Sequence, residues 1–147
     1  MLHLLDKNIK SNFISIDTGL KVHYLECNHK IKKDAPIALL LHGFPEISFS
    51  WRKILPLLSK EGLRVIAIDQ RGYGKTLGGS KKYEDDIREY NLINLVSDLV
   101  SFLNEMNINN IDLLVGHDAG SIVAGAATLL RPDLFKSLVL MSAPFTG

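Results

Sequence analysis

The sequence has 147 residues, of which 46% are hydrophobic and 22% charged, a balance typical of one globular domain. Lysine and arginine (17) nearly cancel aspartate and glutamate (16), and a formal charge of +1 predicts neither a nucleic-acid partner nor attraction to an acidic membrane. Cys27 is the single cysteine, which excludes an internal disulfide and a cysteine-rich zinc site. No apolar run approaches the roughly 20 residues that span a bilayer, and the start does not resemble a signal peptide. We therefore expect a cytoplasmic protein with no membrane span.

The first half of the chain is predicted to alternate strands with one helix. Apolar and polar residues alternate over 13–16 and 20–25 around a short turn, which predicts a β-hairpin. Residues 37–41 and 65–68 are apolar throughout, as expected of strands covered on both faces. Between these strands, four apolar residues recur at helical spacing, although a proline indicates that the helix proper begins near it, after a looser turn. The four are Trp51, Ile54, Leu55 and Leu58, and the proline is Pro56.

The second half continues the alternation. A polar loop over 75–89 precedes an amphipathic helix over 92–103, for which Asn91 is the expected N-cap. A strand over 111–115, a helix over 121–130 and a last strand over 137–141 follow. We therefore predict an α/β fold in a single domain (1–147), with a mostly parallel sheet, helices on both faces and an antiparallel hairpin at one edge.

A glycine-flanked aspartate lies between the strand at 111–115 and the helix at 121–130. The order strand, GHDAG turn (116–120) and helix is that of a nucleophile elbow. Gly116 and Gly120 leave out the Cβ atoms where strand and helix backbones nearly touch, so the side chain of Asp118 should be exposed. Many elbows carry a serine that a histidine activates, whereas an aspartate with a pKa of about 3.9 is already an anion. Asp118 is therefore the candidate nucleophile, and a carboxylate suits attack on the saturated carbon of an epoxide or a carbon–halogen bond.

Four motifs, in this order, make the sequence similar to the α/β-hydrolase family and specifically to its epoxide hydrolase branch, from about residue 37 to 145. They are HGFPE at 42–46 followed by SW at 50–51, DQRGYG at 69–74, GHDAG at 116–120 and RPD at 131–133. The resemblance implies that Asp118 opens an epoxide to a diol through an alkyl ester, and that the backbone N–H groups of Phe44 and Ala119 form an oxyanion hole. It implies a small apolar epoxide and water as substrates, with no cofactor and no metal. The position of Ala119 agrees, because N–H groups at a helix N-terminus point outward.

Two alternatives to epoxide hydrolysis remain open. Haloalkane and haloacid dehalogenases share the elbow, but that resemblance would place tryptophan or arginine at position 119, and the haloalkane branch usually has asparagine at position 44. Ala119 offers no side-chain donor to a departing halide, which favours the epoxide branch, although many epoxide hydrolases carry an aromatic residue here. The other alternative is a non-catalytic truncated paralogue or binding fragment. In the family, the lid and the acid–histidine pair that activates water follow the strand ending near Met141, so we expect that this chain alone cannot complete turnover.

Several residues near the motifs receive structural interpretations. We expect His42 to brace its loop, His117 to point away from the pocket, and Asp69 and Arg71 to hold the 69–74 loop. Trp51 fits either the core or the pocket wall. The remaining histidines, His3, His23 and His29, fall outside the position expected for the water-activating base. The sequence does not identify the epoxide or the oligomeric state.

Overall fold

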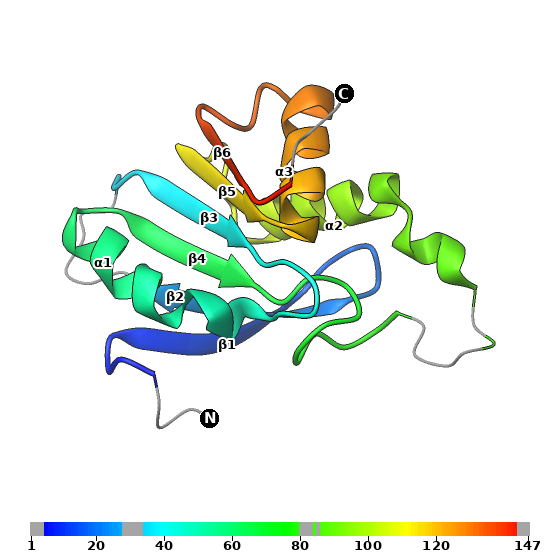
Figure 1. The fold of residues 1–147 in the computed structure, drawn as a ribbon, viewed down its shortest axis with the longest axis horizontal. Helices are drawn as coiled ribbons and strands as arrows, with labels where there is room; N and C mark the ends of the chain where they lie inside the picture. The colour runs from blue at the N-terminus through cyan, green and yellow to red at the C-terminus, as the bar shows by residue number, and fades with distance from the viewer. Residues whose placement is uncertain (1–4, 28–33, 80–83, 85, 144–147) are drawn as a thin grey trace.

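The structure is a computed structural model that describes residues 5–27, 34–79, 84 and 86–143. Six strands form one sheet in the order β1-β2-β4-β3-β5-β6 (Figure 1). In chain order these are β1 (Ile9–Ser15), β2 (Lys21–Cys27), β3 (Ile37–Leu41), β4 (Arg64–Ile68), β5 (Leu113–His117) and β6 (Leu138–Met141). Strands β3 to β6 run parallel, whereas β1 pairs antiparallel with β2, and β2 antiparallel with β4. The predicted mostly parallel sheet with a hairpin at one edge is confirmed.

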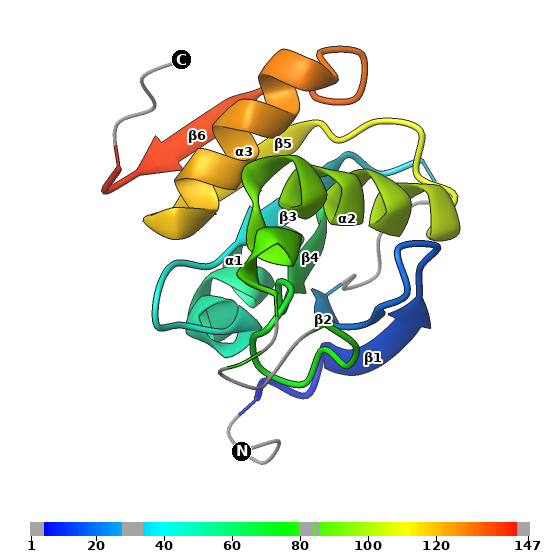
Figure 2. The same ribbon diagram turned by 90° about the vertical axis from the view of Figure 1, so that its right-hand side faces the viewer.

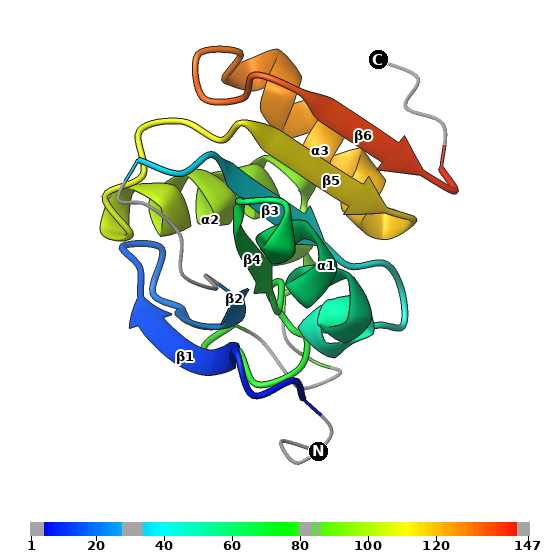
Figure 3. The same cartoon turned by 90° about the vertical axis from the view of Figure 1, so that its left-hand side faces the viewer.

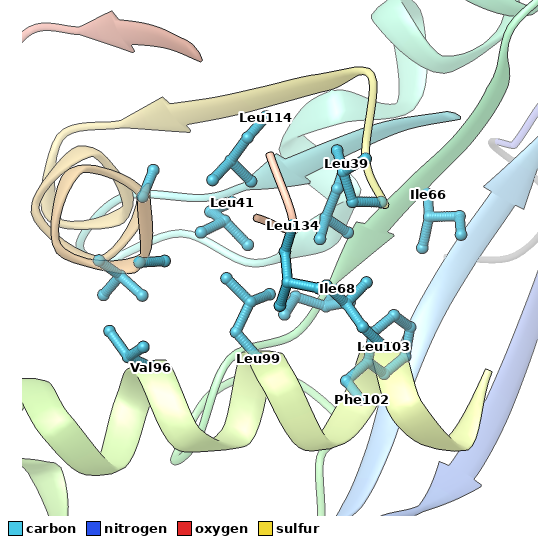
Figure 4. Packing of buried hydrophobic residues seen from close by; sticks show 14 of the residues in the cluster. Leu39, Leu41, Ile66, Ile68, Val96, Leu99, Phe102, Leu103, Leu114 and Leu134 are labelled. Carbon is cyan, nitrogen blue, oxygen red and sulfur yellow. The ribbon is translucent and has the colours of Figure 1, made fainter. Parts of the chain in front are cut away.

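Helices cover both faces of the sheet, as predicted. Helix α1 (Ile54–Lys60) lies on one face, and α2 (Leu92–Glu105) and α3 (Ala119–Leu130) lie on the other (Figures 2 and 3). Successive side chains of a strand point to opposite faces, so β3 contributes to both cores. Leu39 and Leu41 belong to the larger core with α2 and α3 (Figure 4), whereas Ala38 and Leu40 belong to the smaller core with α1. Burial of apolar side chains on both faces is therefore what stabilises the sheet.

Two short 3-10 helices modify the predicted elements. The segment expected to be one helix begins as η2 (Ser48–Lys53) and continues as α1 from Ile54. Pro56 therefore falls in the first turn of α1, where its missing N–H removes no helical hydrogen bond. The expected 75–89 loop ends in a second 3-10 helix, η3 (Ile87–Tyr90), because Asp86 accepts a hydrogen bond from the Arg88 N–H at its start. Part of that loop, residues 80–83 and 85, lies outside the described residues.

The boundaries around the elbow differ slightly from those predicted. Strand β5 begins at Leu113 instead of residue 111, since Ile111 forms only an isolated bridge with Phe135. At its other end β5 continues to His117, so Asp118 directly follows the strand. The predicted N-cap of α2 is confirmed, because the Asn91 side chain accepts a hydrogen bond from the Asn94 N–H at 2.9 Å.

Strand β6 forms one edge of the sheet that the structure describes. Its apolar side chains Leu138, Val139 and Met141 are 36–43% exposed. An exposed apolar edge is prone to pair with other chains, so we expect aggregation to begin here when it is uncovered. Within the described ranges, no helix has the length and apolar character needed to cross a membrane.

Candidate active site

Asp118 occupies a strained turn between β5 and α3. Its backbone has φ +51° and ψ −120°, outside the regions that a non-glycine residue usually adopts. Such a conformation costs of the order of 1–3 kcal/mol and persists only when its surroundings hold it. Here the Asp118 N–H donates to the Met141 carbonyl at 2.8 Å, and the Asp118 carbonyl accepts from the Ser121 N–H at 2.9 Å. The turn is thus fixed to β6 on one side and to α3 on the other, and the Asp118 side chain remains partly exposed.

The two glycines of the turn lie at close backbone contacts. A Cβ atom on Gly116 would lie 2.4 Å from the Gly120 carbonyl oxygen, and one on Gly120 would lie 2.5 Å from the Leu41 carbonyl oxygen. Both distances are shorter than real Cβ contacts, so any larger residue would push α3 away from the sheet. The close approach predicted from the sequence is present, and it also brings the elbow next to the end of β3.

Two backbone N–H groups converge on the Asp118 carboxyl group. The Phe44 N–H, from the loop after β3, donates to Asp118 Oδ1 at 2.8 Å. Hydrogen bonds from the Phe44 and Ala119 backbone N–H groups hold the pKa of Asp118 below its ordinary value of 3.8. The side chain is therefore an anion at neutral pH. The two donors that the sequence suggested for an oxyanion hole thus both reach this carboxylate.

A pair of side chains joins the 42–46 loop to the elbow. Glu46 accepts hydrogen bonds from the Gly43 N–H at 3.2 Å and from His117 Nδ1 at 3.0 Å. His117 follows Val115 by two residues on β5, so its ring lies on the α1 face, where it meets Trp51 edge-on at 6.5 Å between ring centroids. The sequence interpretation did not assign a role to Glu46, although its position at the end of HGFPE was the available signal.

His42 lies beneath the same loop and is completely buried. Its Nε2 accepts from the Gln70 N–H at 3.1 Å, so Nδ1 carries the proton and donates to the Gly43 carbonyl at 2.9 Å. The Gln70 side chain returns a bond to the His42 carbonyl at 2.7 Å. Burial lowers the pKa of His42, which favours this neutral form. Both ring nitrogens therefore hold backbone atoms in place.

The 69–74 loop is anchored by two charged side chains. Asp69 is 1% exposed and accepts from the Ser48 N–H at 2.7 Å, the Lys75 N–H at 2.8 Å and His23 Nδ1 at 2.7 Å. Arg71 makes a two-pronged contact with Asp98 of α2, at 2.6 and 2.7 Å. This arrangement ties the ends of β3 and β4 to the helices on both faces of the sheet.

Comparison with known proteins identifies the family of this chain. A family model described as the alpha/beta hydrolase fold matches residues 36–147. The chain belongs to the α/β-hydrolase family. It is similar to "Epoxide hydrolase 3" of Siraitia grosvenorii, with 42% identity over 133 residues, which are 90% of this chain and 39% of that protein. "Epoxide hydrolase B" of Mycobacterium tuberculosis is 42% identical over 129 residues, which are 88% of this chain and 34% of that protein.

Solved structures of epoxide hydrolases match the fold. An epoxide hydrolase from an endophytic Streptomyces has a TM-score of 0.83 and 33% identity over 96% of this chain and 39% of its own. Potato (Solanum tuberosum) epoxide hydrolase I has a TM-score of 0.83 and 33% identity over 95% of this chain and 41% of its own. The chain thus spans about two fifths or less of the length of these relatives.

Trp51 and Ser121 support the elbow from inside the fold. Trp51 is 8% exposed and belongs to the smaller core with Leu55, so it supports His117 from within the core. Ser121 is completely buried, and its Oγ donates to the Gly116 carbonyl at 2.7 Å and accepts from the Met141 N–H at 3.1 Å. Ser121 thus joins β5, α3 and β6, a role hidden in the sequence because Met141 lies 20 residues further on.

No metal site accompanies this elbow in the part of the chain that the structure covers. There, no group of three or more histidine, cysteine, aspartate or glutamate side chains could hold an ion. The site geometry is accordingly built from one carboxylate, two backbone donors and the side chains that position them.

Proposed function

We propose that this chain carries the nucleophilic part of an epoxide hydrolase, in which Asp118 opens the ring of a small apolar epoxide. The observation that carries the proposal is the 2.8 Å hydrogen bond from the Phe44 N–H to Asp118 Oδ1, on a partly exposed carboxylate at the start of α3. An ionised carboxylate needs no base before it attacks saturated carbon. The names of the related epoxide hydrolases support the choice of substrate class.

The first step is ring opening. Asp118 Oδ2 attacks a ring carbon from the side opposite the carbon–oxygen bond, and the electron pair of that bond passes to the ring oxygen. The resulting alkoxide oxygen takes a proton from water, which leaves a hydroxyalkyl ester on Asp118. The Phe44 N–H keeps Oδ1 in place during the attack, because the hydrogen bond fixes the rotation of the carboxylate.

The second step is hydrolysis of the ester. Water adds to the ester carbon, and the former Oδ1 becomes an oxyanion that the Phe44 and Ala119 N–H groups stabilise. Loss of one such donor typically costs about 2.7–4 kcal/mol of transition-state stabilisation. Collapse of this intermediate releases the diol and restores the carboxylate.

A base for the second step is expected from outside the described residues. Among the histidines that the structure covers, His42 holds backbone atoms through both ring nitrogens, His23 contacts Asp69, and His117 contacts Glu46 on the α1 face. His3 and His29 lie outside the described residues. We therefore expect this chain alone to form the ester at Asp118 and not to complete its hydrolysis.

Dehalogenation is the less favoured chemistry for the same nucleophile. A halide leaving group is helped by side-chain N–H donors, and the methyl group of Ala119 offers none. The product of an epoxide instead keeps its oxygen, which needs only a proton. The lack of a side-chain donor at position 119 therefore favours the epoxide.

Trapping the ester tests the proposal. The full chain is incubated with styrene oxide, and intact and peptide mass spectrometry locate the adduct. We expect one adduct on the peptide containing Asp118, its loss in Asp118→Asn, and its retention in the matched surface variant Asp133→Asn. Multiple turnovers would contradict the expected arrest, and a higher yield of adduct from 1-chlorohexane than from the epoxide would favour a dehalogenase.

A further inference from the structure

A cavity lies apart from the elbow, beside the β1–β2 hairpin. Its volume is about 170 Å³, and its apolar lining comes from Leu5, Leu25, Ile47 and Phe49. Asp118 is not part of this lining. A space of this size and character fits a short alkyl or acyl chain.

Three polar residues of the same lining form a hydrogen-bonded chain. Ser11 Oγ lies 2.8 Å from His23 Nε2, and His23 Nδ1 lies 2.7 Å from Asp69 Oδ2. His23 is 4% exposed and Asp69 is 1% exposed, whereas Ser11 is only partly buried. Of the three hydrogen-bonded side chains, the Ser11 hydroxyl group is therefore the one that a substrate can reach.

Strand register explains how these residues meet. In the β1–β2 pair, Ser11 lies opposite Leu25, and Phe13 lies opposite His23. Ser11 and His23 are thus diagonal neighbours on one face of the hairpin. Asp69 follows β4, and its N–H donates to the His23 carbonyl at 2.9 Å, which brings its carboxylate to the other side of the ring.

The proton positions on Ser11, His23 and Asp69 are those that activation of a serine requires. Burial opposes ionisation of Asp69, but hydrogen bonds from His23, Ser48 and Lys75 lower its pKa to about 2. As an anion, Asp69 can only accept, so the His23 proton lies on Nδ1. Nε2 is then free to accept the Ser11 hydroxyl proton, the same division of roles as in a Ser-His-Asp triad.

We propose that Ser11, His23 and Asp69 form a second nucleophilic site, at which Ser11 accepts the acyl group of a small apolar ester. Ser11 Oγ bonds to the ester carbonyl carbon while its proton passes to His23 Nε2. The carbon–oxygen bond to the alcohol breaks, and the departing oxygen takes that proton from His23. Water then adds to the acyl-serine and returns a proton through His23 to Ser11 Oγ, so the balance is ester plus water to acid plus alcohol.

The surroundings of Ser11 define the preferred substrate. The apolar walls take the acyl chain, and the small volume limits it to a few carbons. Lys75 adds a cationic residue to the lining, which suits the negative charge that develops on the ester oxygen. The Ser48 and Lys75 backbone N–H groups already bond to Asp69, so they orient the acid and are not donors to the substrate.

Acylation of the full chain by p-nitrophenyl butyrate tests this proposal. We expect a burst of p-nitrophenolate close to one equivalent, with the butyryl group located on Ser11 by peptide mass spectrometry. Ser11→Ala should lose the burst, and His23→Gln should slow it at least tenfold. The matched control is Ser15→Ala on the same strand, which lies outside the cavity lining and should keep the burst.

Ser11→Ala removes one oxygen atom from a partly buried position, so we expect the variant to fold. Circular dichroism checks that it does. A folded Ser11→Ala variant that keeps the full burst would overturn the proposal. So would a butyryl group found on another residue, or no burst from the folded unmodified chain. Peptide localisation separates this site from the elbow, so failure here leaves the proposed ester at Asp118 unaffected.

Discussion

Asp69 and Asp118 occupy equivalent places in the sheet but differ in their surroundings. Each directly follows a parallel strand, β4 or β5, at the same end of the sheet. Asp69 is 1% exposed and accepts bonds from two backbone N–H groups and a histidine, whereas Asp118 is partly exposed and receives backbone N–H groups alone. The comparison shows that burial and the number of donors decide whether a carboxylate anchors loops or remains available to a substrate.

Removing the two carboxylates should affect stability very differently. Asp69→Ala leaves three donors, two of them buried, without their acceptor, and we expect it to lower the free energy of unfolding by about 3–5 kcal/mol. Asp118→Asn should leave the unfolding midpoint nearly unchanged, because the side chain is partly exposed and the asparagine Oδ1 can still accept the hydrogen bond from the Phe44 N–H. Urea unfolding followed by circular dichroism measures both. Equal losses of stability would remove the distinction between the two sites.

Ser121 offers a way to loosen the elbow without touching the Asp69 loop. Ser121→Ala removes a buried hydrogen bond to Gly116 and a partly buried one to Met141, and we expect a loss of about 1–3 kcal/mol in the free energy of unfolding. The control is Ser97→Ala on the exposed side of α2, where the hydroxyl donates to the Ile93 carbonyl one turn earlier. It should leave stability nearly unchanged in the same urea titration. A loss from Ser97→Ala as large as that from Ser121→Ala would contradict the assigned role.

Acid should weaken the fold through Asp69. Its pKa is about 2 in the folded protein against 3.8 for the unfolded side chain. Because the folded value is the lower one, the stabilisation is present above pH 3.8 and is lost as the pH falls from 3.8 through 2. It amounts to about 2 kcal/mol. Urea unfolding at a series of pH values should show this loss, and Asp69→Asn should lack that part of it.

Local patterns predicted most of the fold because they are carried by neighbouring residues. Hydrophobic spacing and the Asn91 cap placed α2, and continuous apolar runs placed β3 and β4. The insertion of β4 between β2 and β3 was not predicted, since strand order depends on contacts between distant segments. The two 3-10 helices were missed because three residues per turn gives a short and weak pattern.

Some residues of the candidate sites could be predicted from local motifs, and others could not. Asp118, Phe44 and Ala119 could be proposed from their motifs, and the glycines at 116 and 120 predicted the close approach of backbones that the structure contains. The hydrogen-bonded series of Ser11, His23 and Asp69 could not be predicted, because the three residues come from different strands or strand ends. His23 and Asp69 lie 46 residues apart in the sequence. Contacts of this kind become visible only when the register of the sheet is known.

The most direct test of the central claim compares ester formation at Asp118 with that at two other aspartates in one digest. After the full chain is treated with styrene oxide, the fraction of ester is measured at Asp118, at Asp69 and at the exposed surface residue Asp133. We predict ester at Asp118 in large excess over both of the others. Ester at Asp69, or equal ester at Asp118 and Asp133, would contradict the proposal that the elbow prepares one carboxylate for attack.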